Sequence, residues 1–120
     1  MKKIYHLSGC TTCQRILKDL NPGKGVILQD IKTEKITPEQ LDEMKKMAGS
    51  YESLFSRVAI KYRTLGLNQK KLNETDYRNY ILKEYTFLRR PVVICENEIF
   101  IGNSQLVVES AKKRMKTKKP

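Results

Sequence analysis

The chain opens with alternating polar and apolar residues, the pattern of a β-strand. From Lys2 to Leu7 this alternation places Ile4 and His6 on one face and Tyr5 on the other. A turn-forming Ser-Gly pair follows. We therefore predict a first strand at residues 2–7.

A helical spacing follows. Between Thr11 and Leu20, apolar residues recur every three or four positions, and the Asn-Pro-Gly run at 21–23 ends the pattern. The next apolar residues, Val26–Asp30, predict a second short strand.

The middle of the chain is predicted to be helical throughout. Thr37 has the features of a helix N-cap, with proline next and glutamine three residues on, and Gly49 ends that helix. Residues 51–62 predict a short helix, 65–67 a turn, and 73–84 a further helix.

The last third predicts a hairpin and a helix. Val92–Cys95 and Glu98–Ile101 are two strands joined by a two-residue turn. The Gly-Asn-Ser run at 102–104 opens a final helix that extends through Lys113.

This order of elements determines the expected fold. Strands that alternate with helices imply a partly parallel sheet, and the terminal hairpin adds an antiparallel edge. We predict an α/β fold: a thioredoxin/glutaredoxin-like, mixed four-stranded sheet flanked by helices, with an all-helical insert between its two halves. Residues 1–111 would form one domain, with the insert at about 37–86, followed by a basic tail at 112–120.

The charge is strongly positive, but much of it lies at one end. The 120 residues carry a net charge of +11, and the last nine contain six lysines and arginines and no acid. This tail is either a solvated chain end or a segment that attracts polyanions weakly. No motif for specific nucleic-acid recognition is present, so we expect no specific nucleic-acid partner. No apolar run reaches the ~20 residues of a membrane span, and no signal peptide precedes the first strand. We therefore expect a cytoplasmic protein without a membrane partner.

The cysteines carry the clearest chemistry. Cys10 and Cys13 form a C-x-x-C motif where the first strand meets the first helix. The unpaired N–H groups and positive dipole at a helix start stabilise a thiolate, so the pKa of Cys10 should be lowered. Cys13 lies one turn further on and could form a disulfide with Cys10. The motif predicts thiol–disulfide chemistry with Cys10 as nucleophile and Cys13 as resolving thiol.

Two other interpretations of the cysteines stay open. Cys10, Cys13, Cys95 and His6 could bind zinc, although no second ligand pair has the usual spacing, so we expect no metal. Alternatively, both motif cysteines could be buried structural residues. Cys95 itself is expected in the core.

A second cluster of candidate residues surrounds the motif. His6 either stabilises the Cys10 thiolate or is a half-buried strand residue. Arg89 and Arg90 precede Pro91, at a strand start that could accommodate a cis peptide. If that strand lies beside the first one, Arg90 could form an oxyanion site with the helix start; otherwise both arginines are surface charges.

Several motifs together resemble the ArsC/Spx family, which contains glutaredoxin-linked arsenate reductases and Spx-type regulators. The resemblance covers nearly the whole chain. The motifs are Tyr5-His6-x-x-x-Cys10, Leu54-Phe55-Ser56-Arg57, Tyr62-Arg63-x-Leu65-Gly66-Leu67, Phe87-Leu88-Arg89-Arg90-Pro91-Val92-Val93 and Phe100-Ile101-Gly102.

The resemblance implies a thioredoxin-like fold and reduction of arsenate, or a related small oxidised substrate, by the Cys10 thiolate. It also implies an oxyanion site, for which the candidates are His6, Thr11, Thr12, Arg57 and Arg90, with Gly9 and Pro91 as structural residues. No bound cofactor is expected. The reductant would be an external thiol: thioredoxin if Cys13 forms an internal disulfide, or glutathione and glutaredoxin in a single-cysteine cycle.

The same family offers an alternative that is not an enzyme. Spx-type members contact RNA polymerase, and their cysteine pair acts as a disulfide switch. The family's middle arginine corresponds to Val58 here, beside Arg57, and its third arginine corresponds to Gly102. A member that binds an unknown oxidised thiol partner is a third hypothesis.

Overall fold

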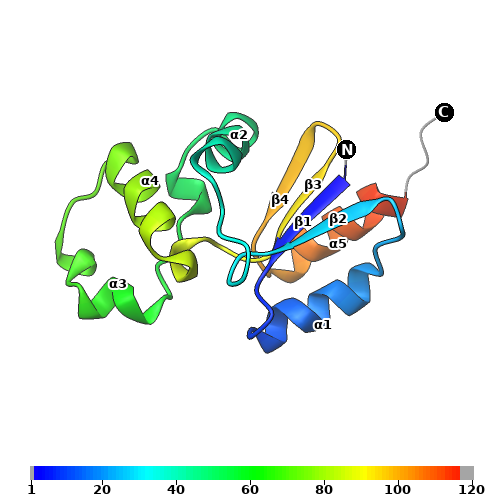
Figure 1. The fold of residues 1–120 in the computed structure, drawn as a ribbon, viewed down its shortest axis with the longest axis horizontal. Coiled ribbons are helices and arrows are strands. Elements are labelled where there is room, and N and C mark those ends of the chain that lie inside the picture. The colour runs from blue at the N-terminus through cyan, green and yellow to red at the C-terminus, as the bar shows by residue number, and fades with distance from the viewer. Residues whose placement is uncertain (1, 117–120) are drawn as a thin grey trace. The chain divides into compact units, whose positions relative to one another are not determined.

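The structure, a computed structural model, describes residues 2–116 and contains the predicted alternation of strands and helices (Figure 1). The strands and α-helices are β1 (Lys2–His6), α1 (Thr11–Leu20), β2 (Val26–Asp30), α2 (Pro38–Ala48), α3 (Ile60–Thr64), α4 (Glu74–Lys83), β3 (Val92–Cys95), β4 (Glu98–Ile101) and α5 (Gln105–Lys116). Short 3₁₀ turns are η1 (Glu52–Leu54), η2 (Leu67–Gln69) and η3 (Tyr85–Phe87). No helix in the described part of the chain is both long and apolar enough to span a membrane.

The four strands form one mixed sheet in the order β2-β1-β3-β4. Strand β1 is parallel to β2 and antiparallel to β3, and β3 is antiparallel to β4. This confirms the predicted α/β fold.

The chain divides into two compact units. The first comprises the residues up to Lys35 and those from Arg90 onward, and therefore contains the whole sheet with α1 and α5. The second, Ile36–Arg89, contains α2, α3, α4 and the 3₁₀ turns.

In the first unit, α1 and α5 pack on the same face of the sheet (Figure 1). This face contributes Ile4 from β1, as the alternation predicted, together with Val93 from β3. The helices contribute the buried side chains Ile16, Leu20, Val108 and Ala111. Burial of these side chains removes apolar surface from water and holds α1 and α5 against the sheet.

The second unit is built around aromatic side chains. The ring of Phe55 stacks on Phe87 at 5.1 Å between centroids, and Tyr77 lies 4.9 Å away. Helix α2 has the capping box that Thr37 predicted, in which the Thr37 hydroxyl accepts from the N–H of Gln40 and the Gln40 side chain accepts in return.

The prediction of a single helix at 51–62 is wrong. Only η1 and the start of α3 are helical there, and the backbone between them is extended at Phe55. The cause is tertiary: the N–H of Arg89 donates to the carbonyl of Leu54, and the N–H of Ser56 donates to the carbonyl of Phe87. These bonds form a bridge between two segments that no local pattern reveals.

Helix α5 extends beyond its predicted end. It continues to Lys116, three residues past Lys113, so the first part of the predicted basic tail is helical. Lys112 pairs with Asp19 at 2.8 Å and Arg114 pairs with Glu98 at 2.6 Å. Residues 117–120 of that tail lie outside the described residues.

Candidate functional site

The start of α1 holds the two motif cysteines. Cys10 is the N-cap, with extended backbone, and its sulfur accepts a hydrogen bond from the N–H of Cys13 at 3.4 Å. Capping residues are usually Ser, Thr, Asp or Asn, so a cysteine here places sulfur where an oxygen usually satisfies the first N–H groups. Both cysteines are free thiols in this structure.

This position favours the Cys10 thiolate. Partial burial opposes a charge there, but hydrogen bonds from the backbone N–H and the side chain of Cys13 outweigh it. The charge of Arg90 and the N–H of Thr12 act in the same direction, so the pKa of Cys10 is lowered from its ordinary value. The start of α1 and the charge of Arg90 therefore both favour the thiolate form of Cys10.

Cys13 has the opposite character. Its side chain is 1% exposed, and burial, together with the nearby Cys10 charge, raises the pKa of Cys13 to about 11. The two thiols of one helical turn thus differ in both exposure and acidity. This asymmetry suits one thiol that attacks and one that waits in protonated form.

The sheet brings Arg90 and Pro91 to the end of the sheet where the cysteine loop begins. Strand β3 pairs antiparallel with β1, with Tyr5 opposite Val92, so β3 starts where β1 ends. The two strands are therefore neighbours, which is the condition under which Arg90 could contribute to an oxyanion site at the helix start. The Arg90–Pro91 peptide is cis, Pro91 is buried, and Arg90 is half-buried with its Nε out of solvent contact. Arg89 is exposed.

His6, the last residue of β1, contacts the helix as well as the strand. Its Nδ1 lies 3.3 Å from the side-chain nitrogen of Gln14, which also donates to the carbonyl of Leu7 at 3.0 Å. The side chain of Gln14 therefore connects the first turn of α1 to the end of β1.

A carboxylate holds the loop between His6 and Cys10. The N–H groups of Ser8 and Lys32 donate to Asp30 Oδ1 at 3.2 and 3.1 Å. The pKa of Asp30 is lowered, mainly by the hydrogen bond from the Ser8 side chain; burial opposes this effect, and the N–H groups of Lys32 and Ser8 add to it. The position of the loop is thus fixed from β2.

The sequence did not reveal Gln14 or Asp30 as site residues. Asp30 is opposite His6 in the parallel β1–β2 register. Gln14 is one helical turn from Cys10, and its N–H donates to the Cys10 carbonyl. A polar residue one turn after a nucleophile and an acid at the end of the neighbouring strand are the signals that could have identified them.

The remaining motif residues take simple positions. Thr11 is exposed and Thr12 is half-buried at the start of α1, where helix N–H groups lack helical acceptors. Gly9 is exposed, and a Cβ added there would meet nothing within 4 Å, so steric crowding does not demand glycine.

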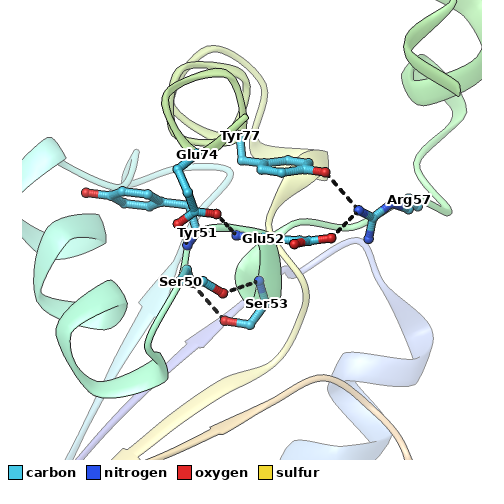
Figure 2. Close-up of polar contacts among 7 residues, drawn as sticks. All are labelled: Ser50, Tyr51, Glu52, Ser53, Arg57, Glu74 and Tyr77. Carbon is cyan, nitrogen blue, oxygen red and sulfur yellow. Dashed lines mark hydrogen bonds and ion pairs between the residues drawn. The ribbon is translucent and has the colours of Figure 1, made fainter. Parts of the chain in front are cut away.

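Arg57 belongs to the second unit and is bound within it (Figure 2). Its guanidinium donates to Glu52 at 2.8 Å and to the Tyr77 hydroxyl at 2.9 Å, and lies 5.6 Å from the centre of the Tyr77 ring. The carboxylate of Glu74 accepts from the N–H groups of Tyr51 and Glu52, which fixes the segment that presents Glu52. Arg57 thus carries local partners for its charge.

The structure offers no support for zinc. Across residues 2–116, no cluster of three or more His, Cys, Asp or Glu side chains could hold a metal ion. Cys95 pairs in register with Lys2, the first residue of β1, whereas His6 is the last residue of that strand. The Cys95 side chain is fully buried in the core. It therefore does not join the motif cysteines.

Comparisons with known proteins add a family. The sequence profile of the ArsC family matches residues 5–111. A comparison with curated proteins gives no match.

Solved structures share the fold. An arsenate reductase from Vibrio cholerae has a TM-score of 0.70 at 19% identity, with 93% of this chain and 95% of that chain covered. An arsenate reductase-related protein from Brucella melitensis has a TM-score of 0.69 at 22% identity, covering 91% and 92%. A protein from Staphylococcus aureus has a TM-score of 0.73 at 24% identity, covering 92% and 97%. At these identities the likeness shows the fold alone.

Proposed function

The chain belongs to the ArsC family, and on this premise we propose that it is a thiol-dependent oxidoreductase that reduces arsenate or a related small oxidised substrate. The observation that carries the proposal is the contrast between two thiols in one helical turn. Cys10 has a lowered pKa beside Arg90, whereas Cys13 is buried with a pKa of about 11. The family's reductases make arsenate the first substrate to test.

The first step is attack by the Cys10 thiolate on arsenic. A sulfur–arsenic bond forms, one arsenate oxygen takes up protons from solvent, and it leaves as water. The N–H groups at Thr11 and Thr12 and the Arg90 guanidinium supply positive charge for the oxyanion. His6, at the end of β1, is the further candidate donor.

The second step uses Cys13. Its sulfur attacks the Cys10 sulfur and its proton goes to solvent, so a disulfide forms and the sulfur–arsenic bond breaks. That electron pair reduces arsenic from the +5 to the +3 state, and arsenite leaves. Once Cys10 is bonded to arsenic, its negative charge no longer raises the pKa of Cys13, which favours this order of events. An external dithiol such as thioredoxin then returns two electrons.

The test is arsenate-dependent oxidation of NADPH by the purified protein, with a thioredoxin system and separately with glutathione and glutaredoxin. We expect Cys10→Ser to abolish turnover. We expect Cys13→Ser to stop turnover with thioredoxin while leaving one equivalent of Cys10 reactive. Cys95→Ala is the matched control, because it also removes a thiol but from the core. No arsenate-dependent turnover with either donor would refute arsenate as the substrate.

One observation favours a second candidate, a redox-controlled binding protein of the Spx type. The family's third arginine corresponds to Gly102, whose φ of +98° strains any residue other than glycine, and Arg57 is engaged by Glu52. Such a site would hold a doubly charged oxyanion less tightly. Copurification with RNA polymerase that changes with oxidation of Cys10 and Cys13, without reductase turnover, would favour this candidate.

A further inference from the structure

We propose that Gln14 is a positioning residue that fixes the tautomer of His6, so that the imidazole carries its proton on Nε2. This N–H is then the group that His6 offers to an anion at the Cys10 loop. The role of this N–H toward an anion rests on the proposed function, whereas the tautomer of His6 follows from its contacts alone.

The Leu7 carbonyl can only accept hydrogen bonds. Because the side chain of Gln14 lies 3.0 Å from that oxygen, the atom there must be its amide nitrogen. The same nitrogen lies 3.3 Å from His6 Nδ1. An amide nitrogen carries two hydrogens, and one is directed to each acceptor. His6 Nδ1 therefore accepts, and a neutral ring must carry its proton on Nε2.

The surroundings hold Gln14 in this position. Its backbone N–H donates to the Cys10 carbonyl at 3.1 Å, so the residue is fixed in the first turn of α1. The acid facing His6 is Asp30, its partner in the β1–β2 register. Asp30 Oδ1 already accepts from the N–H groups of Ser8 and Lys32. The hydrogen-bond partner of His6 Nδ1 is thus the Gln14 amide and not the Asp30 carboxylate.

The test exploits the composition, because His6 is the only histidine in the chain. A long-range ¹H–¹⁵N correlation spectrum of ¹⁵N-labelled, tag-free protein, recorded in alkaline buffer, will show one imidazole. We expect a protonated Nε2 and an unprotonated Nδ1, in roughly fivefold excess over the other tautomer, as one net hydrogen bond gives. A protonated Nδ1 in the unmodified protein would overturn the proposal.

The substitution Gln14→Glu should reverse the tautomer of His6. A carboxylate only accepts, so we expect the proton to move to Nδ1 and the two ¹⁵N shifts to exchange character. Gln40→Glu is the matched control: it makes the same change at the third position of α2, where glutamate preserves the capping box, and it should leave His6 unchanged. A folded Gln14→Glu protein with Nε2 still protonated would also overturn the proposal.

Arsenate added to Cys10→Ser protein separates this inference from the proposed function. We expect the His6 Nε2 signal to shift together with the N–H signals of Thr11 and Thr12. Shifts at the threonines without one at Nε2 would overturn the role of His6 as a donor. If none of these signals moves, the arsenate proposal fails, while the tautomer stands or falls by the first spectrum alone.

Discussion

The two units each present an arginine that the sequence marks as a candidate anion binder, and the two are used differently. In the first unit, hydrogen bonds from Cys13 lower the pKa of the Cys10 thiol against the effect of burial, and the charge of Arg90 adds to them. In the second unit, Arg57 contacts the Glu52 carboxylate at 2.8 Å and the Tyr77 hydroxyl (Figure 2). The closest charged partner of Arg57 is thus a carboxylate, whereas the charge of Arg90 acts on a thiol.

The surroundings of the two arginines explain this difference. The first unit concentrates positive potential at one point, where the start of α1 and Arg90 meet a sulfur. Ordinary ion pairs occur in both units: Arg78–Asp42 and Lys61–Glu84 in the second, besides the pair at Arg57, and Lys112–Asp19 and Arg114–Glu98 in the first. The difference is local: Arg90 acts on the Cys10 thiol, whereas Arg57 joins η1 to α4.

The largest expected effect concerns the two thiols of the first unit. At pH 7, iodoacetamide should modify Cys10 at least about 100-fold faster than Cys13, because a pKa of about 11 leaves Cys13 almost wholly protonated. Mass spectrometry of tryptic peptides after timed labelling measures both rates. Similar rates at the two cysteines would contradict the asymmetry on which the proposed mechanism depends.

A second experiment compares the arginines directly. Arg90→Gln should raise the pH at which Cys10 alkylation reaches half its maximum rate, by up to about one unit, because a cation beside the thiolate is lost. Arg57→Gln makes the same chemical change in the second unit and should leave that midpoint unchanged. Equal shifts in the two variants would show that the contrast between the arginines is false.

Local patterns were sufficient for much of the fold. The alternation in β1 and the apolar spacing of α1 predicted both elements, and the Thr37 capping box predicted the start of α2. The motif at Cys10 could be predicted as a helix start for the same reason. These features depend on residues within about one turn of each other, so the sequence displays them directly.

Features that depend on distant residues were beyond this reasoning. The segment after η1 is extended because Leu54 and Ser56 hydrogen-bond to residues more than thirty positions away. The hydrogen bond between Arg57 and Tyr77 joins residues twenty positions apart, and no local pattern indicates it. Gln14 became relevant only when the chain placed it against two acceptors at the end of β1.

A third prediction concerns pH and the charge pairs of the second unit. Hydrogen bonds from Arg78, and then from Tyr51, lower the pKa of Asp42 from 3.8 to about 2, although burial opposes them slightly. Because the folded-state pKa is the lower one, this contribution to stability is present above about pH 4 and is lost as pH falls toward 2. The unfolding free energy should therefore decrease over this range by more in the unmodified protein than in Asp42→Asn. Identical pH dependence in both proteins would show that the carboxylate gains nothing from its partners.

The smallest expected effect is the coupling energy between Arg57 and Glu52. Measuring it tests whether Arg57 serves only to join parts of the second unit. Its pair with Glu52 is exposed on both sides, at 45% and 57%, so solvent screens the attraction and it should contribute less than about 1 kcal/mol. Urea unfolding of Glu52→Gln, Arg57→Met and the double variant gives the coupling energy between the two side chains. The Arg57→Met loss should exceed the Glu52→Gln loss, because it also removes the hydrogen bond to Tyr77 and the contact with its ring. If Arg57→Met instead leaves stability unchanged and weakens arsenate-dependent turnover, Arg57 acts on the anion after all, and the two arginines share a single role.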